Sequence, residues 1–241
     1  MTAVLLHAGV CDRRMWDGVV PALHGEGHEV VAPDLRGFGS RPPGPAPFSH
    51  AGDVLALLDG LGAERADLVG ASFGGLVALE VAALAPERVR SLALLAPLLL
   101  AWEWSEHFRS YVRAEDAALA RGDVDAAVEL NVRYWAGDAD PRVQDYVAAA
   151  QRRAFELGDG GAEAEELDPP VSERLGDVAA PALVMVGDGD VPDFVAIARH
   201  LAGTLPRAEL RVVEGAGHLL ALERPAEVGA ALAAWLRAGG R

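Results

Sequence analysis

The stretch Gly70-Ala71-Ser72-Phe73-Gly74-Gly75 decides the fold, because it sets a serine between glycines where one type of secondary structure gives way to another. The apolar run 66–69 before it is typical of a buried strand, and the run 76–85 after it is typical of a helix. Glycines two positions before and after a serine indicate a nucleophile elbow, a strained turn with no room for a Cβ. This pattern predicts that the Ser72 hydroxyl stands at the end of a sheet, beside helix N–H groups that attract negative charge. A plain glycine-serine linker is the alternative.

Composition predicts one large globular α/β domain that carries an inserted subdomain. The chain has 241 residues, of which 51% are hydrophobic and 24% are charged. No apolar run reaches the roughly 20 residues that span a bilayer, and the first residues lack the pattern of a secretion signal. We therefore expect a cytoplasmic protein without a membrane partner.

Charge and residue usage exclude several classes of function. The formal net charge is −15 with no basic cluster, which argues against nucleic acid and anionic membranes as partners. All 21 basic residues are arginines, so a Walker lysine, a Schiff base and a pyridoxal phosphate site are excluded. The single cysteine, Cys11, cannot form an internal disulfide, and no Cys/His cluster has zinc spacing. We expect neither a metal nor a cofactor.

Strand and helix patterns alternate along most of the chain, which predicts a mostly parallel, doubly wound sheet with helices on both faces. The strands are expected at 4–6, 29–32, 66–69, 89–95, 182–186 and 210–213, and the helices between them at about 14–25, 49–61, 76–85, 193–205 and 225–236.

The alternation breaks between the strand near 89–95 and the strand near 182–186. Only helical periodicity is found there, with helices near 105–121, 123–135 and 141–157. We expect a core domain formed by 1–97 and 175–241, with 98–174 as a helical lid over the active edge of the sheet. The aromatic residues of the lid either bind substrate or form the small core of the insertion: Trp102, Trp104, Trp135 and Phe155.

A nucleophilic serine needs a base to take its proton and a third group to orient that base. His218 is the one histidine in a glycine-bracketed loop directly after a predicted strand, so it is the candidate base. Asp188, Asp190 and Asp193 follow the preceding strand. The residues alone leave the choice among these three acids open.

Several segments together resemble the α/β-hydrolase family, in its serine hydrolase branch. The resemblance covers essentially the whole chain outside the insertion, and it selects Asp190 as the acid. Its motifs are Leu5-Leu6-His7-Ala8-Gly9 with Trp16, Asp34-Leu35-Arg36-Gly37-Phe38-Gly39-Ser40, the elbow, Gly187-Asp188-Gly189-Asp190, and Gly215-Ala216-Gly217-His218 with Glu223-Arg224-Pro225.

The resemblance implies an oxyanion hole built from the backbone N–H groups of Phe73 and Gly9, with Val10 as a rival to Gly9. It implies an acyl-enzyme on Ser72 and no cofactor. The small-molecule substrate would be a small, mostly apolar carboxylic ester or lactone, as for the similar bacterial esterases, enol-lactone hydrolases and cofactor-free perhydrolases. The alternatives are a lyase, cyclase or carbon-carbon bond-cleaving enzyme with the same triad, and a receptor that retains it.

The chain departs from the family pattern at two places. Ala8 stands where the family usually has glycine, and the antiparallel strands that usually begin the sheet are missing. Residues 29–32 are therefore expected at a sheet edge, protected by a neighbouring segment or by the partner of a homodimer. Asp34 and Arg36 are expected to hold their loop, and Cys11 to be a buried thiol without a catalytic role.

Overall fold

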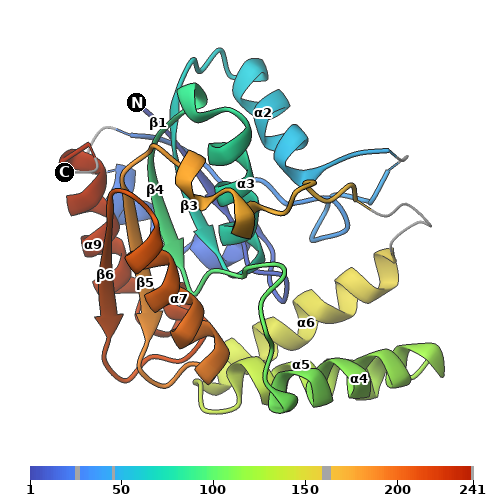
Figure 1. Ribbon diagram of the computed structural model, residues 1–241. Helices are drawn as coiled ribbons and strands as arrows, with labels where there is room; N and C mark the ends of the chain where they lie inside the picture. The colour runs from blue at the N-terminus through green and yellow to red at the C-terminus, as the bar shows by residue number, and fades with distance from the viewer. Residues whose placement is uncertain (25–27, 45–46, 159–163, 240–241) are drawn as a thin grey trace.

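The computed structural model describes residues 1–24, 28–44, 47–158 and 164–239. These residues form a six-stranded sheet in the order β2-β1-β3-β4-β5-β6, and every strand pair in it is parallel (Figure 1). The predicted α/β architecture is confirmed. The strands are β1 (Thr2–Leu6), β2 (Glu29–Val31), β3 (Ala66–Ala71), β4 (Val89–Leu95), β5 (Ala182–Gly187) and β6 (Ala208–Val213).

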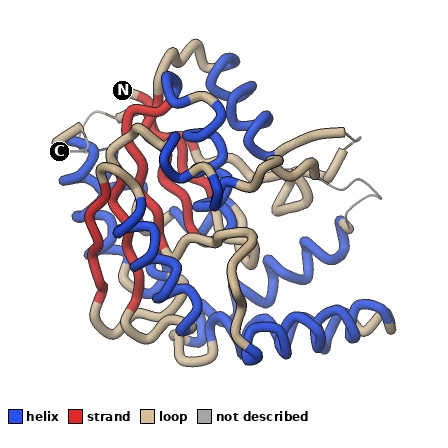
Figure 2. The backbone as a smooth tube through the Cα atoms, viewed as in Figure 1, coloured by secondary structure: helices blue, strands red, loops and turns tan. Residues whose placement is uncertain are grey.

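Helices cover both faces of the sheet (Figure 2). One apolar core lies under α1 (Val20–His24) and α9 (Pro225–Arg237), and the other under α2 (His50–Gly60), α3 (Phe73–Leu84) and α7 (Pro192–Thr204). All six residues of β3 and of β5 are buried. This explains why β5 is a continuous apolar run and why the residues of β3 other than Asp67 are apolar, rather than alternating with polar ones.

The register of the parallel strands brings the functional loops to one edge. Val69 of β3 pairs with Leu5 of β1 on one side and with Ala93 of β4 on the other. Parallel strands end at the same edge, so the segments that follow β1, β3, β5 and β6 come together there. These segments contain the predicted oxyanion loop, the elbow, the acids and the histidine.

In the described part of the chain, three α-helices lie between β4 and β5 and form a layer of their own beside the sheet (Figure 1). They are α4 (Glu106–Ala120), α5 (Val124–Ala136) and α6 (Pro141–Leu157), and we call them the helical insertion. Each begins where the sequence indicates, because the side chains of Ser105, Asp123 and Asp140 accept hydrogen bonds from first-turn N–H groups. The domain boundaries at 98 and 174 stay a prediction.

One predicted helix was wrong. The segment expected as a single helix from 14 to 25 is a 3-10 helix, η1 (Arg13–Trp16), followed by a turn and the short α1. A Cβ on Gly18 would lie 2.8 Å from Pro225 Cβ, so the chain packs closely against the start of α9 at this turn. Residue 25 lies outside the described residues.

β2 forms an edge of the sheet, as its sequence predicted. It has three residues, its Glu29 is exposed, and α1 packs beside it. A short charged strand is a poor template for unwanted pairing. Pairing with a second subunit stays a prediction.

The remaining short elements lie in loops. They are the four-residue helix α8 (Leu220–Glu223) and the 3-10 helices η2 (Pro86–Arg88), η3 (Val171–Glu173) and η4 (Leu175–Asp177). Of the helices described, none combines the length and the apolar character needed to cross a membrane.

Candidate active site

The turn at Ser72 is a strained elbow between β3 and α3. Ser72 has φ 49° and ψ −112°, a conformation that costs a non-glycine residue free energy. A Cβ on Gly70 would lie 2.2 Å from the carbonyl oxygen of Gly74, and a Cβ on Gly74 would lie 2.2 Å from that of Leu6. Both motif glycines are therefore required by close backbone approach. The Ser72 N–H donates to Leu95 O at 2.8 Å, which fixes the turn against β4.

His218 and Asp190 meet where the loops after β6 and β5 lie side by side. The Nδ1 atom of His218 lies 2.9 Å from Oδ1 and 3.1 Å from Oδ2 of Asp190. The side chains are 3% and 0% exposed. Two carboxylate contacts at Nδ1 favour a proton on that nitrogen, which leaves Nε2 free to accept one. Ser72 and His218 line the same cavity.

The neighbouring acids have other partners. Asp188 accepts the N–H of Gly215 at 2.7 Å, which ties the end of β5 to the histidine loop. Asp193 accepts from the N–H and the hydroxyl of Ser105 at 2.8 and 2.6 Å, which anchors the start of α4. Of the three candidate acids, Asp190 is the one whose described contacts include the histidine.

Glu223 holds the histidine loop in place. Its carboxylate accepts the N–H of Gly217 at 2.6 Å and that of Leu219 at 2.9 Å, so both neighbours of His218 are fixed. The sequence motif around Glu223 therefore has a structural explanation.

Two aromatic rings flank the imidazole. The ring centroids of Trp135, from α5, and of Phe194, from α7, each lie 4.4 Å from that of His218. Trp135 also lines the cavity, as does Phe155. The other two predicted tryptophans are not among the lining residues in the described part of the chain: Trp102 packs on His200, and Trp104 stacks on Phe108.

The loop after β1 is held by bonds within itself and by a bond to the loop after β2. His7 is buried, its Nε2 accepts the N–H of Leu35 at 2.9 Å, and its Nδ1 lies 2.8 Å from Ala8 O. Burial lowers the pKa of His7, which agrees with a neutral ring that carries its proton on Nδ1. Ala8 O also accepts the N–H of Cys11 at 3.0 Å. Gly9, Val10 and the elbow residue Phe73 line the cavity.

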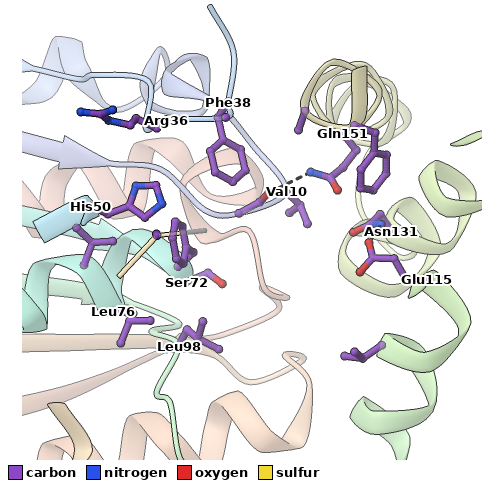
Figure 3. Close-up of a pocket in the computed structure, with 18 of the residues that line it drawn as sticks. Val10, Arg36, Phe38, His50, Ser72, Leu76, Leu98, Glu115, Asn131 and Gln151 are labelled. Carbon is purple, nitrogen blue, oxygen red and sulfur yellow. Dashed lines mark hydrogen bonds between the residues drawn. The ribbon is translucent and has the colours of Figure 1, made fainter. Parts of the chain in front are cut away.

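The cavity at Ser72 has a volume of about 1370 Å³, larger than a small ester needs. Apolar side chains near Ser72 include Val10, Leu76 and Leu98, and polar ones across from it include Glu115, Asn131 and Gln151 (Figure 3). The sequence interpretation missed His50, which lies beside Phe73 with ring centroids 5.0 Å apart. Its position at the first turn of α2 offers no sequence signal for a place at the site.

Carboxylates in the cavity wall carry raised pKa values. Burial, with a smaller contribution from Glu166, raises the pKa of Glu80 to about 7. Burial also raises the pKa of Glu115, whose Oε1 accepts from Asn131. Arg36 lines the cavity as well, but Asp53 binds its guanidinium through two bonds of 2.5 and 2.8 Å.

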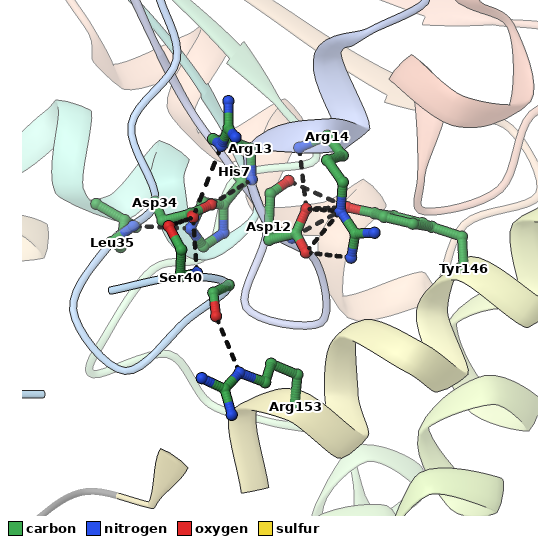
Figure 4. A network of polar contacts seen from close by, with 10 residues as sticks. His7, Asp12, Arg13, Arg14, Asp34, Leu35, Ser40, Tyr146 and Arg153 are labelled. Carbon is green, nitrogen blue, oxygen red and sulfur yellow. Dashed lines mark hydrogen bonds and ion pairs between the residues drawn. The ribbon is translucent and has the colours of Figure 1, made fainter. Parts of the chain in front are cut away.

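The Asp34 loop is held as its sequence predicted (Figure 4). Asp34 accepts from the N–H of Arg13 at 2.9 Å and from the N–H and hydroxyl of Ser40 at 2.9 and 2.8 Å. Burial raises its pKa, but these bonds outweigh burial and leave the pKa below its usual value. Burial raises the pKa of the Cys11 thiol, which disfavours a thiolate nucleophile.

Residues 2–225 match the family model of the alpha/beta hydrolase fold. The chain belongs to the α/β-hydrolase family. The resemblance stated from the sequence is thereby confirmed, and hydrolase is the general class of enzyme that it supports.

Two relatives are about a third identical to this chain over the matched residues. A putative carbamate hydrolase of Variovorax paradoxus is 32% identical, with 90% of this chain and 84% of that protein covered. The dihydrolipoyllysine-residue acetyltransferase component of the acetoin cleaving system of Pseudomonas putida is also 32% identical over 97% of this chain. This chain spans 63% of the length of that component.

A solved structure of similar fold is a thermophilic esterase from Thermogutta terrifontis. It is 26% identical, covers 100% of this chain and 91% of its own, and superposes with a TM-score of 0.78. In the described residues, no group of three His, Cys, Asp or Glu side chains is arranged to hold a metal ion.

Proposed function

We propose that the chain is a serine hydrolase that cleaves a carboxylic ester or lactone through an acyl-enzyme on Ser72. The observation that carries the proposal is the meeting of a strained serine elbow and a buried histidine-carboxylate pair at one cavity. Carbonyl substrates are cleaved by this combination on several folds.

In the proposed cycle, the Ser72 oxygen attacks the carbonyl carbon while His218 Nε2 takes the hydroxyl proton. Asp190 holds the imidazole by Nδ1 and stabilises the imidazolium. The tetrahedral intermediate collapses, and the leaving alcohol takes the proton from His218. Water then repeats the two steps on the acyl-enzyme and releases the acid.

The oxyanion hole is proposed to use the N–H of Phe73 and that of Gly9, with Val10 as the alternative in the same loop. The N–H of Phe73 is at the first turn of α3, where no helical carbonyl precedes it. Donors fixed before the reaction stabilise the developing negative charge without reorganisation.

The substrate is proposed to be mostly apolar where it contacts Val10, Leu76 and Leu98. The cavity volume of about 1370 Å³ leaves room for an acyl or alcohol group larger than the small one expected from sequence. Trp135 is proposed to contact both substrate and His218, and the helical insertion to act as a lid.

The test combines a p-nitrophenyl ester chain-length series with a fluorophosphonate label located by peptide mass spectrometry. We expect label on Ser72, and a loss of about 10⁴-fold or more in kcat/KM for Ser72→Ala. Ser110→Ala, which changes an exposed serine of α4, is the matched control and should keep its activity. An active Ser72→Ala enzyme refutes the proposal, and labelling of Ser72 without turnover of any ester favours a lyase or cyclase.

A further inference from the structure

Helix α6 of the insertion reaches back to the loop proposed to form the oxyanion hole. The side chain of Gln151 donates from Nε2 to the carbonyl oxygen of Gly9 at 3.0 Å (Figure 3). One turn earlier, the Tyr146 hydroxyl accepts the N–H of Asp12 at 3.0 Å and lies 3.0 Å from Asp12 O (Figure 4). Both ends of the segment 9–12 are thus bound by one helix that is far away in sequence.

The peptide before Gly9 is fixed by the loop itself. Its carbonyl, Ala8 O, accepts from Cys11 N–H and lies 2.8 Å from His7 Nδ1. Because a peptide unit is planar, this also fixes the direction of the Gly9 N–H. No contact with α6 is needed for this part of the loop.

The peptide after Gly9 depends on α6. The carbonyl of Gly9 and the N–H of Val10 belong to one planar unit and point in opposite directions. Gly9 has no side chain, so its two backbone dihedrals are the freest in the loop. The bond from Gln151 restrains them, and with them the angle between the two candidate oxyanion donors.

The setting of Gln151 favours this role over that of a surface contact. The residue is 4% exposed and lines the cavity. A buried amide is costly unless it is hydrogen-bonded, and its Nε2 donates to Gly9 O. Gln144, two turns earlier on α6, has different targets, since its Nε2 donates to the carbonyls of Ala136, Gly137 and Ala139 within the insertion.

We propose that Gln151 is a positioning residue of the oxyanion hole, through which α6 holds the Gly9–Val10 peptide at the angle that the transition state requires. The proposal rests on the proposed hydrolase function. Gln151 acts through the backbone of Gly9, so its loss should affect the transition state more than the bound substrate.

The test compares Gln151→Met, which keeps the length but not the donor, with Gln144→Met as the matched control. We expect Gln151→Met to lower kcat for the best p-nitrophenyl ester by about 10- to 100-fold, with KM changed less than about threefold. The affinity for an alkyl trifluoromethyl ketone, whose tetrahedral adduct places its oxygen in the hole, should fall by a similar factor. Gln144→Met should retain kcat and inhibitor affinity.

A second variant distinguishes the loss of the hydrogen-bond donor from misfolding. Gln151→Glu has nearly the same shape, and its carboxyl group can donate to Gly9 O only when protonated. Its activity relative to wild type should therefore rise as pH falls, whereas that of Gln151→Met should not. Thermal melts of all variants identify any that fail to fold.

The rate at which fluorophosphonate labels Ser72 separates this proposal from the function on which it rests. If the wild type is not labelled, the hydrolase proposal fails and this one with it. If the wild type is labelled, the positioning role is refuted by an unchanged labelling rate and kcat in Gln151→Met. Equal losses in Gln144→Met, or a change confined to KM, also refute it.

Discussion

Replacing each of the three aspartates that follow β5 by asparagine tests the proposed acid where the sequence left a choice. The expected effects differ because the partners differ: His218 for Asp190, Gly215 for Asp188 and Ser105 for Asp193. Asparagine is close in size to aspartate, so the comparison isolates charge and acceptor capacity.

Asp190→Asn should be far the most damaging to activity. Asp190 Oδ1 accepts the Val191 N–H at 2.7 Å, which favours the amide oxygen at that position and the NH₂ group at the position of Oδ2. That group then lies 3.1 Å from His218 Nδ1 and disfavours a proton there, while the uncharged amide oxygen, 2.9 Å from Nδ1, holds such a proton less strongly than a carboxylate. Both changes destabilise the tautomer that can accept a proton from Ser72, and the imidazolium loses its counter-charge. The same substitution in a serine protease triad lowers kcat about 10⁴-fold, equivalent to about 5.5 kcal/mol.

The other two substitutions should affect the supporting structure instead. Asp188→Asn keeps an acceptor for the Gly215 N–H, and we expect less than about a threefold change in kcat. Asp193→Asn loses one of two acceptors for Ser105, so the melting temperature should fall while kcat changes less than about tenfold.

The assay is p-nitrophenyl ester hydrolysis over a range of pH. Fluorophosphonate labelling measures the fraction of molecules in which Ser72 is reactive. The labelling rate of Asp190→Asn should fall with kcat, because both need the base. Retention of more than a tenth of the activity in Asp190→Asn refutes the reasoning. An equally large loss in Asp193→Asn would refute the expectation that Asp190 alone supports the base.

Three further predictions concern stability and the base. Burial lowers the pKa of His50 to about 4, below the usual 6.5 of the unfolded chain, so the free energy of unfolding should decrease as pH falls from 6.5 to 4. In urea titrations His50→Gln should show a smaller decrease over this range. The same pH dependence of the unfolding free energy in wild type and variant would contradict this. Gly74→Ala should prevent stable folding, because its Cβ would lie 2.2 Å from Leu6 O. If circular dichroism shows that the variant melts at the wild-type temperature, the elbow can relax and the prediction is wrong. Trp135→Leu removes one of the two rings beside His218. It should lower kcat by about 3- to 30-fold and change the pH dependence of kcat. A change in KM alone would mean that Trp135 contacts the substrate but does not affect the base.

Much of the fold could be predicted from the sequence because its signals are local. The glycines around Ser72 can be recognised in the sequence because the backbones of Gly70 and Gly74, four residues apart, approach too closely for a Cβ on Gly70. The caps Ser105, Asp123 and Asp140 mark the three helices of the insertion, because each side chain bonds to its own first turn. The helix expected at 14–25 was wrong, and its turn at Gly18 packs against Pro225, a residue far away in the sequence that local patterns do not report.

The sequence by itself determined the α/β alternation, the elbow at Ser72 and the loop histidine His218, since periodicity and turn chemistry are properties of neighbouring residues. Only the tertiary structure brought Asp190 to His218 Nδ1, Trp135 to the imidazole and Gln151 to Gly9 O. These contacts join residues 28, 83 and 142 positions apart. The first depends on the pairing of β5 with β6, and the other two on how the insertion packs over the sheet. Side-chain identity pointed to the proposed nucleophile and base, whereas packing decided which groups surround them.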